Sequence, residues 1–132
     1  MKKTSFLFAI LILTILSSCR KSDDLRPEGC YLENKNTLRL YNTIYNDDMT
    51  DIVDANGNGQ SLEACLLRRQ RTIDFINQLT SFRTIVSNEV NYGCYQGEVD
   101  SLLEDIDDRI RELNEDMEST WNRCEEVYGS GG

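Results

Sequence analysis

Hydrophobic residues recur at intervals of three and four positions along three separate segments of the chain. The segments cover about 34–54, 61–90 and 98–128. This period places the hydrophobic side chains of each segment along one face of an α-helix. No β-hairpin pattern occurs, and Asn-Gly-rich stretches at 56–59 and 91–93 are typical turns between helices. The sequence therefore predicts an all-α fold, an antiparallel up-down-up three-helix bundle over residues 30–128.

Each segment has its own predicted core face. That of the first is formed by Leu38, Tyr41, Ile44, Tyr45, Met49, Ile52 and Val53. The face of the second, with Ser61 as its N-cap, is formed by Leu62, Leu66, Ile73, Ile76, Leu79, Phe82, Val86 and Val90, widened by Phe75 and Ile85. The third carries a coiled-coil-like seam, formed by Val99, Leu103, Ile106, Ile110, Leu113, Met117, Thr120, Cys124 and Val127.

The amino-terminal residues follow a different pattern. Lys2 and Lys3 precede an apolar run over 6–16. As a helix this run is roughly 16 Å long, about half the thickness of a bilayer core. We therefore expect residues 1–18 to be a removable signal peptide.

The end of this run resembles the lipobox of bacterial lipoproteins, in the residues Leu16-Ser17-Ser18-Cys19. The resemblance implies that the thiol of Cys19 is acylated and that Cys19 becomes the first residue after cleavage. A soluble secreted protein cleaved nearby is the alternative. With a lipid anchor, we expect the protein at the outer membrane.

The next residues, Lys21-Ser22-Asp23-Asp24, resemble the charged export signal that follows the acylated Cys in lipoproteins of one Gram-negative phylum. That resemblance implies a position facing the cell surface. If the residues are only a polar spacer, the periplasm remains open. Residues 19–29 are polar and lack periodicity, so we expect a flexible tether, and residues 129–132 a flexible tail.

The composition excludes several kinds of chemistry. The 132 residues include five Cys, one Pro and no His, and 14 basic side chains stand against 23 acidic ones, for a net charge of −9. Without His the chain lacks the usual catalytic triads and His-ligated metal sites. The negative charge argues against nucleic acid as a partner. Nothing marks a catalytic cleft, so we expect no enzyme.

Four cysteines remain once Cys19 is acylated, and an exported chain meets an oxidising compartment. In the predicted bundle, Cys30 and Cys94 lie at one end, whereas Cys65 and Cys124 lie near the other. A disulfide spans only about 4.4–6.8 Å between Cα atoms, but the helices are some 40 Å long. We therefore predict the disulfides Cys30–Cys94 and Cys65–Cys124. A metal site with four Cys ligands is incompatible with two pairs at opposite ends.

Acidic residues are concentrated in the third segment, where twelve lie between Glu98 and Glu126. In the predicted bundle, Arg71 lies level with Glu118, and Arg83 lies level with Ile106, between two aspartates. Arginines of the second segment are thus expected to offset these acids. An acidic strip that binds a basic partner or divalent cations is the alternative; its candidate residues are Asp105, Asp108 and Glu112.

The first turn offers a candidate Ca²⁺ site. Asp54, Asn56, Asn58 and Gln60 occupy positions 1, 3, 5 and 7 of a sequence that resembles an EF-hand loop. Position 12, where a Glu normally completes the coordination, is Cys65. The loop is equally typical of a turn between helices. No other cofactor is indicated.

Trp121 is the only Trp and lies three residues before Cys124. It is expected either to pack over the Cys65–Cys124 disulfide or to bind a partner, and the tyrosines of the first segment present the same alternatives. We expect the protein to act as a lipid-anchored interaction module, an accessory, inhibitor or immunity-type protein, using an acidic or aromatic helical face. A lipoprotein that binds a cation or small ligand at Asp54–Gln60 is the alternative.

Overall fold

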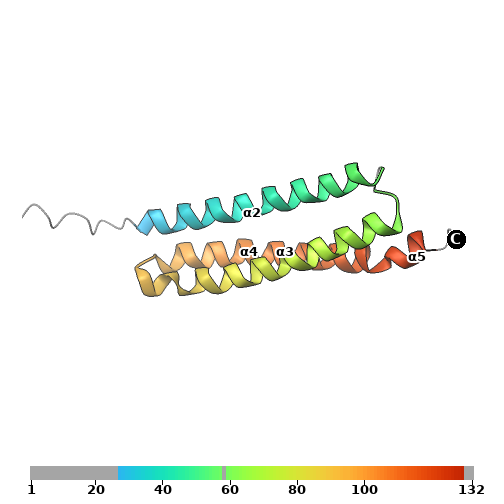
Figure 1. Ribbon diagram of the computed structural model, residues 1–132. Helices are drawn as coiled ribbons and strands as arrows, with labels where there is room; N and C mark the ends of the chain where they lie inside the picture. Colours follow the sequence, from blue (N-terminus) through green and yellow to red (C-terminus); the bar gives the residue numbers. More distant parts are fainter. Residues whose placement is uncertain (1–26, 58, 130–132) are drawn as a thin grey trace, which may run out of the picture.

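Three long helices make up most of the protein (Figure 1). The computed structural model describes residues 27–57 and 59–129. The helices are α2 (Pro27–Ala55), α3 (Leu62–Asn88) and α4 (Gln96–Ser119), and three short elements accompany them: η1 (Glu89–Tyr92), η2 (Trp121–Arg123) and α5 (Cys124–Tyr128). No strand occurs in the described ranges, which confirms the all-α class. The predicted signal peptide, Cys19 and most of the tether lie outside these ranges.

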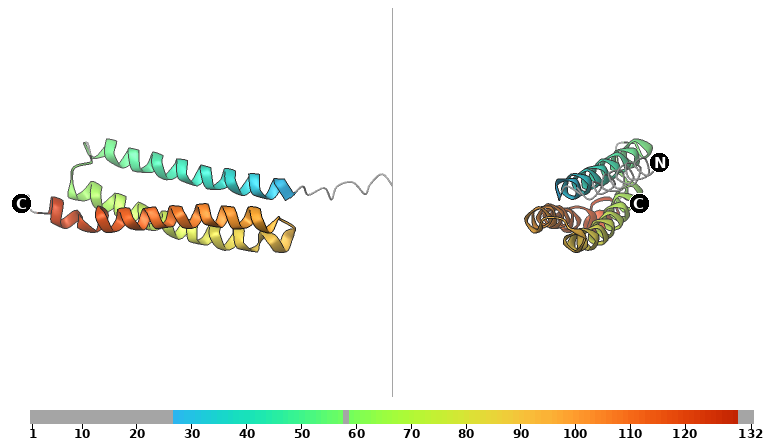
Figure 2. Two further views of the ribbon diagram at one scale, coloured as in Figure 1. Left: turned by 180° about the vertical axis from the view of Figure 1, so that it is seen from behind. Right: turned by 90° about the vertical axis from the view of Figure 1, so that its left-hand side faces the viewer.

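The helices lie side by side as an elongated bundle, and the end-on view shows that each neighbours the other two (Figure 2). One disulfide, Cys30–Cys94, joins the first turn of α2 to the residues before α4, with Cα atoms 5.9 Å apart. The other, Cys65–Cys124, joins the first turn of α3 to α5, with Cα atoms 5.6 Å apart. Both predicted pairs are confirmed.

The three helices enclose one hydrophobic core along the length of the bundle. Its buried residues are Leu38, Tyr45, Phe75, Leu79, Phe82, Val86, Cys94, Val99, Leu102, Ile106 and Leu113. The predicted faces were wrong at several positions. Ile44, Ile73 and Ile85 are exposed, and α4 buries Leu102 more completely than the predicted Leu103. The angle at which two helices cross decides which positions of an apolar face are covered. An average spacing of three and four does not specify this angle.

The helix boundaries follow local chemistry. α2 begins at Pro27, within the predicted tether, and proline is favoured at the first helical position because the N–H that it lacks has no intrahelical partner there. Ser61 caps α3 as predicted, because its hydroxyl accepts a hydrogen bond from the amide of Ala64 at 3.1 Å. Gly59 adopts φ 65°, and a Cβ there would lie 3.0 Å from a methyl of Val53, so the turn before α3 requires glycine.

The predicted third helix is interrupted. α4 ends at Ser119, and Thr120 has φ −126° and ψ −62°, outside the helical region. The chain then packs against α3 through η2 and α5, where Cys124 is bonded to Cys65. The predicted seam positions Thr120 and Val127 are consequently exposed. The break was missed because apolar residues keep their helical spacing across it.

Candidate interaction surface

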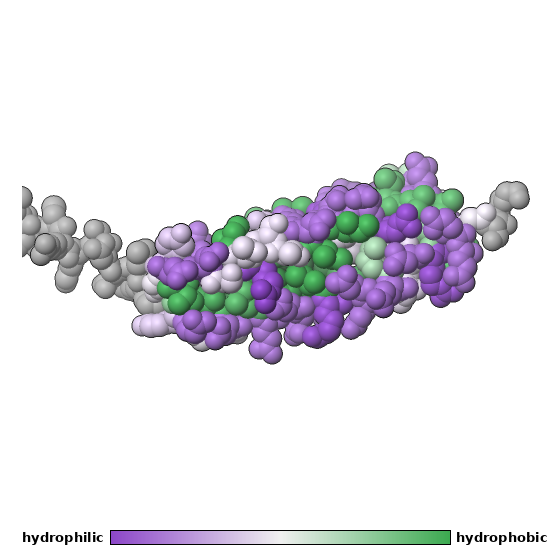
Figure 3. Space-filling model, turned by 90° about the horizontal axis from the view of Figure 1, so that it is seen from below, coloured by the Kyte–Doolittle hydropathy of each residue, from purple (hydrophilic) through white to green (hydrophobic). Residues whose placement is uncertain are grey.

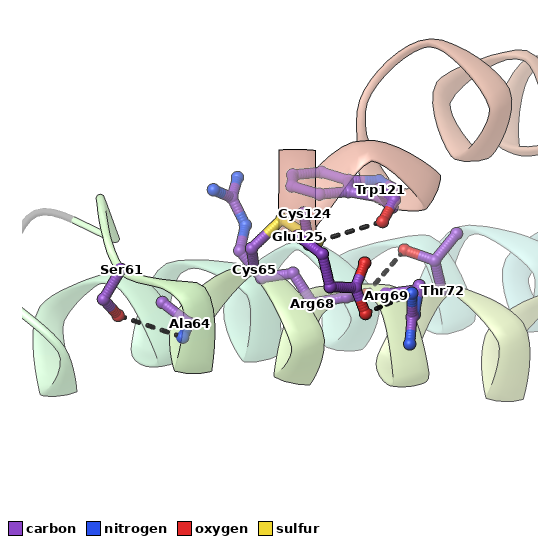
Figure 4. Close-up of a disulfide and its surroundings, with 9 residues drawn as sticks. All are labelled: Ser61, Ala64, Cys65, Arg68, Arg69, Thr72, Trp121, Cys124 and Glu125. Carbon is purple, nitrogen blue, oxygen red and sulfur yellow. Dashed lines mark hydrogen bonds and ion pairs between the residues drawn. A yellow bond between two sulfur atoms is a disulfide. The ribbon is translucent and has the colours of Figure 1, made fainter. Parts of the chain in front are cut away.

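Trp121 lies beside the Cys65–Cys124 disulfide (Figure 4). Its ring is half-buried, and the guanidinium carbon of Arg68 lies 4.4 Å from the ring centroid, a cation–π distance. The ring nitrogen of Trp121 is buried without a hydrogen-bond partner among the described residues. This placement favours packing at the disulfide over an exposed partner anchor.

The tyrosines of α2 turn toward the core. Tyr41 packs edge-on against Phe82, with ring centroids 5.4 Å apart, and Tyr45 stacks on Phe75 at 4.5 Å. The Tyr45 hydroxyl lies 2.9 Å from the hydroxyl of Thr72. These tyrosines therefore serve packing and do not form an aromatic docking face.

Thr72 was missed by sequence reasoning, which counted only apolar positions. It is fully buried. Its hydroxyl donates to the carbonyl of Arg68 at 2.9 Å and so accepts a hydrogen bond from Tyr45. The buried residues of α3 follow one heptad register, and Thr72 occupies one of its core positions. These residues are Cys65, Thr72, Phe75, Leu79, Phe82 and Val86, with Ala64 beside them.

Two of the three acids proposed as a docking strip are paired within α4. Asp108 lies 2.8 Å from Arg111, and Glu112 lies 3.0 Å from Arg109. Asp105 is exposed and faces α2, where it lines a groove together with Lys35. Of the three candidate acids, Asp105 is thus the one for which no ion pair occurs within α4 among the described residues.

Lys35 is the basic side chain opposite Asp105. It donates a hydrogen bond to the Tyr31 hydroxyl at 3.0 Å. This bond raises the pKa of Lys35 above its ordinary value, and the Asp105 carboxylate contributes in the same direction. Lys35 thus presents a positive charge on the α2 side of the groove.

Arginines of α3 reach both neighbouring helices. Arg83 donates to Asp107 of α4 at 2.6 and 2.9 Å, close to the predicted level. This bond lowers the pKa of Asp107 and raises that of Arg83. Arg71 pairs with Asp48 of α2 at 2.6 Å, and not with an acid of the third segment as expected. The position of a residue along the bundle axis can be estimated from its sequence number. This position does not specify which neighbouring helix a long side chain faces.

In the candidate Ca²⁺ loop, the side chain of Asn56 has a structural role. The side-chain amide of Asn56 donates to the carbonyl of Ile52 at 2.8 Å and so stabilises the end of α2. Asp54 and Gln60 are exposed, and Asn58 lies outside the described residues. Over the described ranges, Asp54 belongs to no group of three closely spaced Asp, Glu or Cys side chains.

One such group does occur in the described ranges, formed by Cys30, Glu89 and Cys94. The two sulfur atoms are bonded to each other. They are therefore not thiolates, the form in which cysteine binds metals, and the group is a disulfide with a neighbouring carboxylate.

Exposed apolar side chains occur on α2 as well as on α3. Leu32, Leu40 and Ile44 are 60%, 56% and 44% exposed. Beside them runs a groove of about 470 Å³, called the α2 groove below, which is lined by Leu32, Lys35, Asn36, Leu38, Arg39, Asn42 and Asp105. A second hollow, of about 460 Å³, lies on α2 between Leu32 and Leu40.

Seen from below the orientation of Figure 1, the bundle shows hydrophobic residues in separate groups between hydrophilic ones (Figure 3). Among the described helices, none is long and apolar enough to cross a membrane. Comparison of the chain with protein-family models, curated proteins and solved structures found no match.

Proposed function

We propose that this chain is a lipid-anchored envelope lipoprotein whose bundle binds a protein partner through the α2 groove, without catalysis. Cys19 carries the lipid after residues 1–18 are removed, and the protein lies at the outer membrane. The groove replaces the acidic or aromatic face expected from the sequence, since Tyr45 is buried and Asp108 is paired.

The antiparallel up-down-up course of the bundle is part of the proposal. Cys30–Cys94 links the start of α2 to the start of α4, and Cys65–Cys124 links the start of α3 to the residues after α4. Bonds at these positions support α2 and α4 running in one direction and α3 in the other.

The observation that carries the proposed binding is the combination of apolar and charged groups along the α2 groove. Leu32 and Leu38 supply an apolar lining, whereas Lys35 and Arg39 face Asp105 across it. Covering a half-exposed leucine contributes about 1 kcal/mol, and charges at the rim select the partner. The chemistry suits a helix or extended segment with one apolar side and mixed charge beside it.

Binding to detergent-solubilised envelope proteins tests the groove. Leu32→Glu, in the lining of the groove, is expected to abolish capture of a partner that the native domain retains. Leu67→Glu, at a residue of α3 that is 46% exposed, is the matched control and is expected to leave capture unchanged. Equal capture by all three proteins contradicts the assignment of the groove.

Palmitate labelling in cells tests the anchor separately. The native chain is expected to incorporate label and fractionate with the membrane. Cys19→Ala is expected to lose the label and the membrane association. An unlabelled native chain would contradict the lipoprotein assignment, whatever the result for the groove.

A further inference from the structure

One tip of the bundle, formed by η1 and the start of α4, exposes two tyrosines. Tyr92 is 75% exposed and Tyr95 is 59% exposed. Gly93 lies between them with φ 94° and turns the chain toward α4. A tyrosine joins an apolar ring to a polar hydroxyl, a combination favoured at the boundary between membrane and water.

This tip is free of charge over residues 90–97, although 28% of the whole chain is charged. The two flanking acids turn inward. An oxygen of Glu89 lies 3.4 Å from the sulfur of Cys94, and one carboxylate oxygen of Glu98 is buried. Within residues 90–97, the tyrosine rings are therefore the most exposed apolar groups.

The opposite tip differs in charge. Val127 and Tyr128 are 56% and 36% exposed there. They follow Glu125 and Glu126, which are exposed and pair with Arg69 and Arg123. Exposed carboxylates oppose contact with a lipid surface, because charged groups are costly to remove from water. The segment with Tyr92 and Tyr95 is therefore better suited to a lipid surface than the segment with Val127 and Tyr128.

The tip with the tyrosines also lies next to the start of α2, because the Cys30–Cys94 disulfide joins the two. The inference rests on the proposed anchor at Cys19. Pro27 lies eight positions after Cys19, and eight fully extended residues span at most about 29 Å. α3 has 27 residues, which makes the bundle about 40 Å long. The tyrosine tip is thus the end of the bundle nearest to the acyl chains.

We propose that Tyr92 and Tyr95 insert into the headgroup layer of the membrane that holds the acylated Cys19. A tether alone leaves the bundle free to tumble, whereas two inserted rings determine which end faces the bilayer. The negative charge of the domain opposes anionic lipids, so the surface that fits is zwitterionic.

Tryptophan quenching by brominated phosphatidylcholine vesicles tests this contact in the acylated full chain. The native protein reports from Trp121, near the far tip. Tyr92→Trp combined with Trp121→Phe moves the reporter to the proposed contact. We expect roughly two-fold quenching at position 92, where an inserted ring meets the lipid, and none at position 121. Adding Tyr95→Ser is expected to weaken the quenching. If Trp121→Phe does not fold, the single variant Tyr92→Trp serves instead. Its emission without brominated lipid exceeds that of the native protein, and brominated lipid is expected to remove this excess.

Equal emission with and without bromine at position 92 overturns the insertion, provided that the protein floats with the vesicles and the mass of Cys19 includes the acyl chains. The anchor then stands, and the tip is only tethered. A native chain that neither carries acyl chains nor floats overturns both the anchor and the insertion.

Discussion

At the scale of single residues, Thr72 illustrates how a polar side chain is accommodated in this core. Among the described residues it is the one polar side chain that is fully buried. Its hydroxyl joins the carbonyl of Arg68 to the hydroxyl of Tyr45. Sequence patterns overlook such a residue, because threonine is usually exposed and its value here depends on a partner 27 positions away.

Thr72→Val is expected to lower the free energy of unfolding by about 1–3 kcal/mol, because it leaves the buried hydroxyl of Tyr45 without a partner. Tyr45→Phe removes that hydroxyl and is expected to cost less, about 1 kcal/mol. Urea denaturation of both variants measures the difference. A smaller loss for Thr72→Val than for Tyr45→Phe would refute a hydrogen bond donated by Tyr45 to Thr72.

Asp107 links stability to pH at the α3–α4 interface. Arg83 lowers the pKa of Asp107 in the folded state, so folding is favoured while the carboxylate is charged. This contribution is present above the pKa of the unfolded chain, about 3.9, and disappears as the pH falls through the folded value. NMR titration of Arg83→Ala is expected to raise the pKa of Asp107, and an unchanged value would remove the assigned cause.

At the scale of elements, the sequence predicted three helices but not their limits. Periodicity identified α2 and α3 because their apolar faces are continuous. It extended α4 through Thr120, because Met117 and Cys124 keep the helical spacing on either side of the break. The break depends on packing against α3, which is a tertiary effect. Local chemistry was informative where one side chain acts alone, as at Ser61.

Ser61→Ala is expected to cost about 1 kcal/mol of stability, because the amide of Ala64 loses its acceptor. Ser81→Ala is the matched control. Ser81 lies exposed inside α3, and its hydroxyl only donates to the carbonyl of Asn77. Thermal unfolding is expected to separate the two variants. If the Ser61 cap did not stabilise the fold, both variants would have the same midpoint of thermal unfolding.

At the scale of the whole molecule, the number and positions of the cysteines predicted which helices are joined by disulfides. Both disulfides followed from the count of cysteines and the length of a helix, since a bond is short and the bundle is long. The α2 groove could not be predicted, because it depends on how α2 rests on its neighbours. A lining residue such as Leu32 looks like an ordinary helical position until its exposure is known.

Removing either disulfide is expected to destabilise the domain strongly. The pairs are separated by 64 and 59 residues, and closing such loops contributes about 4 kcal/mol each in the chain-entropy model. Replacing Cys30 and Cys94 together with Ser, or Cys65 and Cys124 together, tests each bond by guanidinium denaturation. A loss close to zero for either pair would show that its bond does not stabilise the fold.

We propose that the anchored bundle binds a protein partner at the α2 groove. Site-specific photo-crosslinking on intact cells tests it most directly, with the crosslinker at Asn36 in the groove and, as a control, at the exposed Asn77 of α3. We expect one discrete protein adduct from Asn36 that Asn77 does not give and that Leu32→Glu abolishes. Identical adducts from both positions, or none from Asn36, would contradict binding at the α2 groove.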